Sequence, residues 1–124
     1  MMTYLVCGTR KKSNTEKVKE VLNFTYHQIH TTSNTENTTT PLMRIIHGNC
    51  PDSADIVADE WARNKERVIV EKFPAKQGQH LQRNLQMLDQ ADIVIAFWDG
   101  YSYGTAFVIA HATQKGMPVR IEKV

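Results

Sequence analysis

The feature that most constrains this chain is the regular alternation of short apolar runs with longer segments of helical periodicity. Five runs rich in Val, Ile and Leu are only three to five residues long, which is typical of strands buried in a parallel sheet. We expect strands at residues 3–7, 42–46, 68–70, 93–97 and 118–121.

Four segments between these runs place apolar residues on one helical face. Ser13 and Glu16 form a capping-box pattern before the first segment, and Gly116 is suited to end the last. The apolar positions are Val18, Val21, Leu22 and Ile29; Ile56, Val57 and Trp61; Leu81, Leu85 and Leu88; and Phe107, Val108, Ile109 and Ala112. The resulting β-α-β-α-β-α-β-α-β order predicts an α/β fold with a mainly parallel five-stranded sheet and helices on both faces.

The length of 124 residues predicts one domain, residues 1–124, with no room for a second core. Residues 31–40 are almost all Thr, Ser, Asn and Glu, and Pro41 closes the stretch. We expect residues 31–41 to form a polar, mobile loop.

The charge balance argues against a nucleic-acid partner. The formal net charge is only +2, and the densest basic run is Arg10-Lys11-Lys12. A short basic run is typical of a solvated loop rather than a binding stripe.

Two cysteines, Cys7 and Cys50, are too few for a disulfide framework or a zinc site, so we expect free thiols. The sequence has no charged-then-apolar leader and no long apolar run. A cytoplasmic protein without a membrane partner is therefore expected.

Three glycine turns follow predicted strands and precede predicted helices. Carboxyl ends of parallel strands share one sheet edge, where ligands bind, and glycines and helix N-termini suit contact with phosphate. The candidate residues of these turns are Gly8, Thr9 and Arg10; Gly48 and Asn49; and Asp99, Gly100, Ser102, Gly104 and Thr105.

Several common cofactor motifs are missing from the sequence. It contains no G-x-x-x-x-G-K-[ST] motif, which excludes a P-loop NTPase, and no G-x-G-x-x-G in the first turn. The five histidines are dispersed and none lies in H-E-x-x-H. We therefore expect no metal and no cofactor.

Three motifs together resemble the SLOG superfamily, the Rossmann-like group that contains the Lonely-guy proteins and the DNA-processing protein A. They are Ile45-Ile46-His47-Gly48-Asn49-Cys50-Pro51-Asp52-Ser53-Ala54-Asp55, Gln82-Arg83-Asn84-Leu85-Gln86-Met87-Leu88, and the run from Ala91 through Phe97-Trp98-Asp99-Gly100-Tyr101-Ser102-Tyr103-Gly104-Thr105. The resemblance extends from Tyr4 to Ile121, excludes the Thr-rich loop, and implies a Rossmann-like three-layer sandwich.

The resemblance also implies roles for individual residues. The Gly48 turn and the Ser102-Gly104-Thr105 turn match loops that face phosphate and ribose. Asp55 matches an acidic position that supports the turn or the ligand, and it is equally suited to the first turn of a helix. Arg83 and Asn84 match a polar pair at the pocket, although a surface cation on an amphipathic helix explains Arg83 equally well. Asn49 departs from the pattern, since many relatives have a second glycine there.

Three classes of function follow. The preferred one is binding of a nucleotide or nucleotide-derived molecule by a sensor or sequestering protein, as the resemblance implies for relatives in bacterial conflict systems. The second is hydrolysis of a nucleotide N-glycosidic bond, as the Lonely-guy proteins perform. The glutamate that those proteins have after the Gly-Thr turn is absent here. Asp99 is its only plausible replacement, because Asp92 begins its strand and so lies at the end of the sheet away from the pocket. The third is binding of single-stranded DNA, which the near-neutral charge disfavours. Relatives commonly dimerise, so a homodimer or higher homo-oligomer is also expected.

Overall fold

The computed structural model describes residues 1–10, 15–32 and 40–124 of the chain. Strands and helices alternate along the whole of this part, as the apolar pattern predicts. The elements are β1 (Met2–Gly8), α1 (Thr15–Thr32), β2 (Met43–His47), α2 (Ala54–Arg63), β3 (Val68–Lys72), α3 (His80–Gln90), β4 (Ile93–Trp98), α4 (Tyr103–Gln114) and β5 (Val119–Lys123).

The strands form one five-stranded sheet in the order β3-β2-β1-β4-β5, and every neighbouring pair is parallel. The chain builds outward from β1 to β3, then crosses back to place β4 on the other side of β1. The strand order therefore reverses between β1 and β4, and this reversal opens a crevice at their carboxyl ends.

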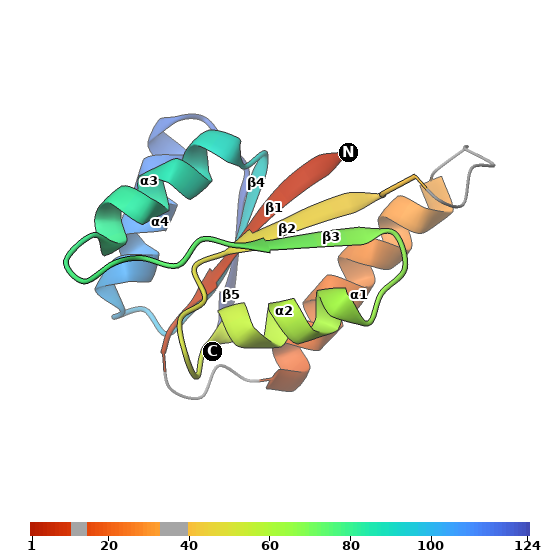
Figure 1. The fold of residues 1–124 in the computed structure, drawn as a ribbon, viewed down its shortest axis with the longest axis horizontal. Coiled ribbons are helices and arrows are strands. Elements are labelled where there is room, and N and C mark those ends of the chain that lie inside the picture. Colours follow the sequence, from red (N-terminus) through yellow and green to blue (C-terminus); the bar gives the residue numbers. More distant parts are fainter. Residues whose placement is uncertain (11–14, 33–39) are drawn as a thin grey trace.

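Helices cover both faces of the sheet, so the molecule has three layers (Figure 1). Helices α1 and α2 lie on one face and bury Val18, Leu22 and Trp61 against β1, β2 and β4. Helices α3 and α4 lie on the other face, where Leu88 and Val108 pack against Leu5, Ile46 and Val94. Because both faces are covered, β1 and β4 contain continuous apolar runs, residues 4–7 and Ile93–Trp98, rather than alternating polar and apolar residues.

The predicted fold class, a Rossmann-like three-layer sandwich with a five-stranded parallel sheet, is confirmed. The predicted loop at residues 31–41 was wrong at its start, because Thr31 and Thr32 belong to α1. Their hydroxyl groups donate to the carbonyl oxygen of Gln28, so these polar side chains are accommodated in the last turn of the helix. Residues 33–39 of that loop, and the predicted cap Ser13, lie outside the described residues.

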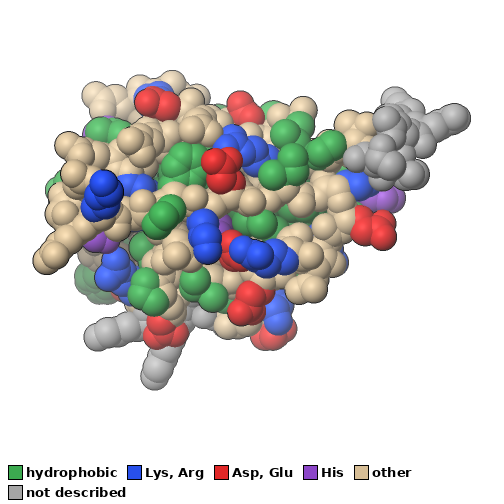
Figure 2. Space-filling model, in the orientation of Figure 1, with side chains coloured by type: hydrophobic (Ala, Val, Ile, Leu, Met, Phe, Trp, Pro, Cys, Tyr) green, Lys and Arg blue, Asp and Glu red, His purple; other side chains and the backbone are tan. Residues whose placement is uncertain are grey.

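None of the helices in the described residues is long and apolar enough to cross a membrane. On the face shown in Figure 2, basic and acidic side chains are interspersed, with hydrophobic side chains scattered among them.

Candidate functional site

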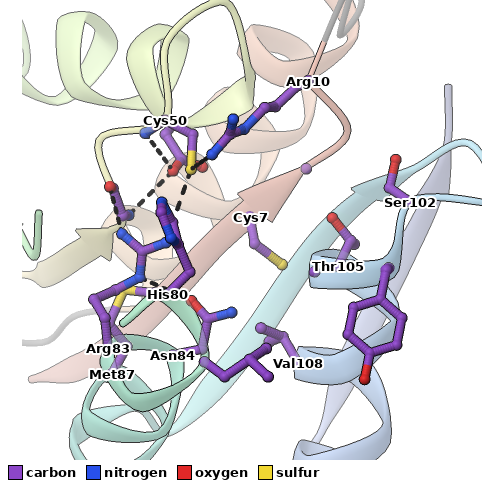
Figure 3. Close-up of a pocket in the computed structure, with 16 residues that line it drawn as sticks. Cys7, Arg10, Cys50, His80, Arg83, Asn84, Met87, Ser102, Thr105 and Val108 are labelled. Atoms are coloured by element: carbon purple, nitrogen blue, oxygen red, sulfur yellow. Dashed lines mark hydrogen bonds between the residues drawn. The ribbon is translucent and has the colours of Figure 1, made fainter. Parts of the chain in front are cut away.

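A cavity of about 440 Å³ lies at the carboxyl edge of the sheet, where the strand order reverses. It is bounded by the ends of β1 and β2 and by α3 and α4, with side chains from all four converging on it (Figure 3). Its lining consists of Cys7, Gly8, Arg10, Gly48, Cys50, Asp55, His80, Leu81, Arg83, Asn84, Met87, Ser102, Tyr103, Gly104, Thr105 and Val108. The two glycine turns that the sequence singles out, around Gly48 and Gly104, therefore face one common cavity.

The turn after β2 is held by a buried carboxylate. Asp55 Oδ2 accepts hydrogen bonds from the backbone N–H groups of Gly48 and Cys50, both at 3.1 Å. Ser53 caps α2: its hydroxyl accepts from the N–H of Asp55 and donates to the carbonyl of Cys50. Burial raises the pKa of Asp55, although the amide of Cys50 and the charges of His47 and Arg83 oppose the shift. Asp55 thus supports the turn, one of the two roles that the resemblance implies.

His47, which has no exposed surface, holds the remaining amide of this turn. The N–H of Asn49 donates to His47 Nδ1 at 3.0 Å, so a neutral ring carries its proton on Nε2 and donates it to Asp59 Oδ2 at 2.6 Å. Asn49 has φ +57°, a left-handed conformation that asparagine tolerates better than most residues. An asparagine therefore fits at this position, where the SLOG pattern that the sequence resembles has a second glycine.

These contacts correct the expectation that the Gly48 turn offers free amides to an anion. The N–H groups of Gly48, Asn49 and Cys50 all donate to side chains of the protein itself. The expectation failed because acceptors at Asp55 and His47 are brought to the turn by folding, which a linear pattern does not display.

Arg83 is buried in the cavity wall, with 7% of its surface exposed. Its Nη1 donates to the carbonyl oxygens of Gly48 at 2.6 Å and Phe73 at 2.9 Å, and its Nε donates to Asn84 Oδ1 at 2.8 Å. A Cβ atom on Gly48 would lie 2.5 Å from Nη1, so the glycine makes room for the guanidinium. Arg83 is accordingly part of the cavity and not a surface cation.

The other wall combines the first turn of α4 with the turn before it. Asp99 Oδ1 accepts from the N–H groups of Tyr101 and Ser102 at 2.8 Å, and the amide of Tyr101 followed by that of Ser102 lowers the pKa of Asp99. The hydroxyl of Ser102 is engaged with Asp99 and Thr9 and does not cap α4. The first-turn residues Tyr103, Gly104 and Thr105 line the cavity, so the N-terminus of α4, which carries a partial positive charge, lies at the cavity wall.

Two glycines on the walls differ in what they permit. A Cβ atom on Gly8 would lie 2.8 Å from Ala54 Cβ and 2.9 Å from the carbonyl oxygen of Phe97, so Gly8 allows β1, β4 and α2 to approach closely. Nothing lies within 4 Å of a Cβ built on Gly104. A side chain at position 104 would extend into open space beside the cavity.

The predicted site residues divide into two groups. Those that line the cavity are Gly8, Arg10, Gly48, Asp55, Arg83, Asn84, Ser102, Gly104 and Thr105. Those that do not line it are Thr9, Asn49, Asp99 and Gly100. Asp99 in particular is committed to the amides of its own turn, which corrects the expectation that it faces the ligand or a sugar.

Sequence reasoning missed several residues of the lining. Cys7 and Cys50 lie next to the predicted glycine turns in the sequence, and this position could have indicated that they line the cavity. Met87 is one turn after Arg83 and was visible as part of the Arg-Asn-x-x-Met motif. Tyr103 begins α4 and was visible as part of the motif that ends at Thr105. His80 begins α3, and nothing in the local pattern marks it.

Among the described residues, no group of three or more His, Cys, Asp or Glu side chains is placed to hold a metal ion. The cavity offers instead two guanidinium groups, a helix N-terminus and an apolar floor of Cys7, Met87 and Val108.

The fold and the position of the cavity define a Rossmann-like α/β protein, a class in which ligands bind at the reversal of strand order. No protein-family model matches the chain, and no curated protein matches it with significance. Among solved structures, the chain is similar to the X-ray structure of TM1055, a structural genomics target, with a TM-score of 0.58 and 17% identity. The match covers 96% of this chain and 72% of that chain, and at this identity it concerns the fold alone.

Proposed function

We propose that this chain is a SLOG-like protein that binds a nucleotide or a nucleotide-derived small molecule in the cavity between β1, β2, α3 and α4. The observation that carries the proposal is that Arg10, Arg83 and the N-terminus of α4 surround one cavity at the strand reversal. Cationic groups and helix amides favour phosphate, and a cavity of this size is in the range of small-molecule sites.

The apolar part of the lining supports a ligand with a flat, weakly polar portion. Met87 and Val108 are buried at the base of the cavity, while Leu81 and Tyr103 lie at its exposed rim. A nucleoside monophosphate combines a base for this apolar part with an anion for the cationic part. Cytoplasmic sensing or sequestration requires no catalytic carboxylate, so this lining is sufficient for that role.

The test is a thermal-shift and calorimetric screen of nucleoside monophosphates, cyclic dinucleotides and ADP-ribose. A ligand at a hundredfold excess over its Kd stabilises the folded state by about 2.7 kcal/mol. For a domain of this length we expect a rise in Tm of about 10 °C, since 1 kcal/mol corresponds to about 4 °C. No shift with any of these compounds would contradict the proposal.

A pair of leucine variants of α4 ties the shift to the cavity. Gly104→Leu extends a side chain beside the cavity from a position with open space around it, and we expect the ligand shift to disappear. Ala110→Leu changes an exposed position of the same helix that does not line the cavity, so the shift is retained. Equal shifts in both variants would place the ligand elsewhere.

The second candidate function is cleavage of a nucleotide N-glycosidic bond, and Asp55 is the observation in its favour. It is the carboxylate among the residues that line the cavity, in place of the absent glutamate after Thr105. Release of free base from nucleoside monophosphates that stops in Asp55→Asn would support hydrolysis. Binding without release of base supports the sensing or sequestering function.

A fluorescence titration with single-stranded oligonucleotides at low salt tests the third class of function, binding of single-stranded DNA.

A further inference from the structure

The Cys50 thiol occupies an unusual electrostatic position in this cavity. Its sulfur lies 3.9 Å from Nη2 of Arg10, in the segment after β1, and 3.9 Å from Nη2 of Arg83, on α3. The two guanidinium groups approach the sulfur from different elements (Figure 3). Cys50 is half-buried and lines the cavity, so small molecules that enter the cavity meet it.

The buried guanidinium group of Arg83 has N–H groups beside Cys50 that can donate to a ligand. Its Nε and Nη1 donate to oxygen acceptors, whereas Nη2 contacts the sulfur of Cys50. A neutral thiol is a weak acceptor. Within the described part of the chain, the N–H groups of Nη2 therefore have no oxygen partner, and an anionic oxygen in the cavity would supply one.

The surrounding charges favour an incoming anion. The guanidinium groups of Arg10 and Arg83 beside the Cys50 sulfur are positively charged, so an anionic group that enters the cavity is attracted to the position next to the thiol. The negative charge of Asp55 opposes this attraction, because its carboxylate hydrogen-bonds both the backbone N–H and the side chain of Cys50. It is, however, one carboxylate against two guanidiniums and is also bound to the amide of Gly48. His80 adds a further basic side chain to the lining.

The second cysteine does not share this environment. Cys7 is buried among Leu5, Met87 and Val94, and burial, followed by the charges of Asp55 and Cys50, raises the pKa of its thiol. The two thiols of the chain should therefore differ strongly in reactivity.

We propose that Cys50 is a covalent modification site for carbon electrophiles that carry a carboxylate, and that its alkylation closes the cavity. The thiolate electron pair forms a C–S bond, the leaving group departs as an anion with the pair of the broken bond, and buffer takes the thiol proton. Arg10 and Arg83 hold the carboxylate of the electrophile. The modification itself depends only on the cavity geometry, while its effect on ligand binding rests on the proposed function.

The test compares the alkylation rates of iodoacetate, which is anionic, and iodoacetamide, which is neutral, by mass spectrometry with peptide mapping. The ratio of the two rates at Cys50 is divided by the same ratio for 2-mercaptoethanol, which removes the intrinsic difference between the reagents. We expect this normalised preference for iodoacetate to be about tenfold at low ionic strength and to fall with salt. A normalised preference of one, or faster labelling of Cys7, would overturn the proposal.

Variants connect the preference to the named residues. In Cys50→Ser the fast label disappears, and in Arg10→Gln the preference for iodoacetate falls severalfold. Arg120→Gln, which removes a partly exposed cation from β5 outside the cavity, leaves the preference unchanged. An equal loss in both arginine variants would attribute the effect to net charge and overturn the proposal.

The labelling experiment is independent of any nucleotide. If no nucleotide shifts the Tm but Cys50 shows the anionic preference, the proposed function fails and the modification site stands. If a nucleotide shifts the Tm and Cys50 shows no preference, this inference alone fails. When both stand, carboxymethylated protein loses the nucleotide shift and bound nucleotide slows labelling.

Discussion

At the scale of single residues, this cavity is built around buried polar groups that hold one another. Asp55 binds the amides of the Gly48 turn, Arg83 binds its carbonyl, and His47 binds the amide of Asn49. Asp55, Arg83 and His47 are each hydrogen-bonded to the turn, which offsets the cost of placing these polar side chains inside a small domain. Removing one member leaves another unsatisfied, so residue changes here should affect stability as well as binding.

Two glycine-to-alanine changes should have opposite effects. In Gly48→Ala the new methyl group would meet the Arg83 guanidinium at 2.5 Å, so the arginine must leave the carbonyls of Gly48 and Phe73, and we expect a loss of about 2–3 kcal/mol. Gly104→Ala meets nothing within 4 Å in the first turn of α4 and should be neutral or stabilising by up to about 1 kcal/mol. Urea unfolding measures both; a Gly48→Ala protein as stable as the wild type would contradict the packing described.

The Asp59 carboxylate should make stability depend on acid pH. Burial alone would raise the pKa of Asp59, but hydrogen bonds and charges from Arg63 and His47 outweigh it and hold the pKa below its usual value. The unfolded chain therefore binds a proton at higher pH than the folded one. The contribution of Asp59 is complete above the ordinary aspartate pKa of about 3.9 and is lost as the pH falls through the lower folded value.

Two substitutions separate the charge of Asp59 from its hydrogen bond. Asp59→Asn keeps an acceptor for His47 Nε2–H and should mainly flatten the acid dependence of the free energy of unfolding. Asp59→Ala leaves that buried donor unpaired and should cost about 1–3 kcal/mol at neutral pH as well. Urea titrations between pH 3 and pH 7 measure both effects, and an unchanged acid slope in Asp59→Asn would show that the carboxylate is not responsible.

At the scale of the elements, the buried face of α3 includes polar residues that line the cavity, while two of its leucines are exposed. Its buried side chains are Arg83, Asn84, Met87 and Leu88, whereas Leu81 and Leu85 are 41% and 43% exposed. The leucine spacing correctly indicates a helix. The face that points inward, however, is a different one. It brings Arg83 to the carbonyl oxygens of Gly48 and Phe73, and it places Leu88 in the core.

Truncation of two leucines on α3 tests this orientation. Leu88 has 1% of its surface exposed, and Leu88→Ala should cost about 2–5 kcal/mol through lost packing and the cavity left behind. Leu85→Ala, on the exposed face, should change the free energy of unfolding by no more than about 0.5 kcal/mol. Similar losses at the two positions would mean that the helix is rotated about its axis.

At the scale of the whole molecule, burial is concentrated in the centre of the sheet, and we expect stability to follow it. Strand β1 pairs with both β2 and β4 and is covered by helices on both faces, while β3 and β5 are edge strands. Residues of β1 from Thr3 to Cys7 are buried, whereas Ile69 on β3 and Ile121 on β5 are partly exposed. The cavity lies at the carboxyl edge of these buried central strands, so we expect its walls to have a rigid base.

Native-state hydrogen exchange should reveal this gradient. Amides of β1 and β4 should exchange only through global unfolding, while those of β5 and β3 exchange through smaller openings. The measurement is the exchange rate of each amide by NMR at low denaturant. Protection of β5 equal to that of β1 would contradict the gradient, and it would also indicate that the exposed β5 edge is covered in solution.

The sequence by itself determined the order of strands and helices, the parallel α/β class and the location of the glycine turns. These properties depend on periodicity and turn residues that act within a few positions along the chain. The placement of the Gly48 and Gly104 turns at one sheet edge then follows from the parallel arrangement.

Only the tertiary structure decided which groups of the turns are free and which are occupied. The amides of the Gly48 turn are bound by Asp55 and His47, Asp99 is committed to its own turn, and Cys50 lies between Arg10 and Arg83. Such contacts join side chains from different elements, and the rotation of each helix about its axis sets them. That rotation depends on packing against partners distant in sequence, so local patterns predict the elements but not which side chains meet in the cavity.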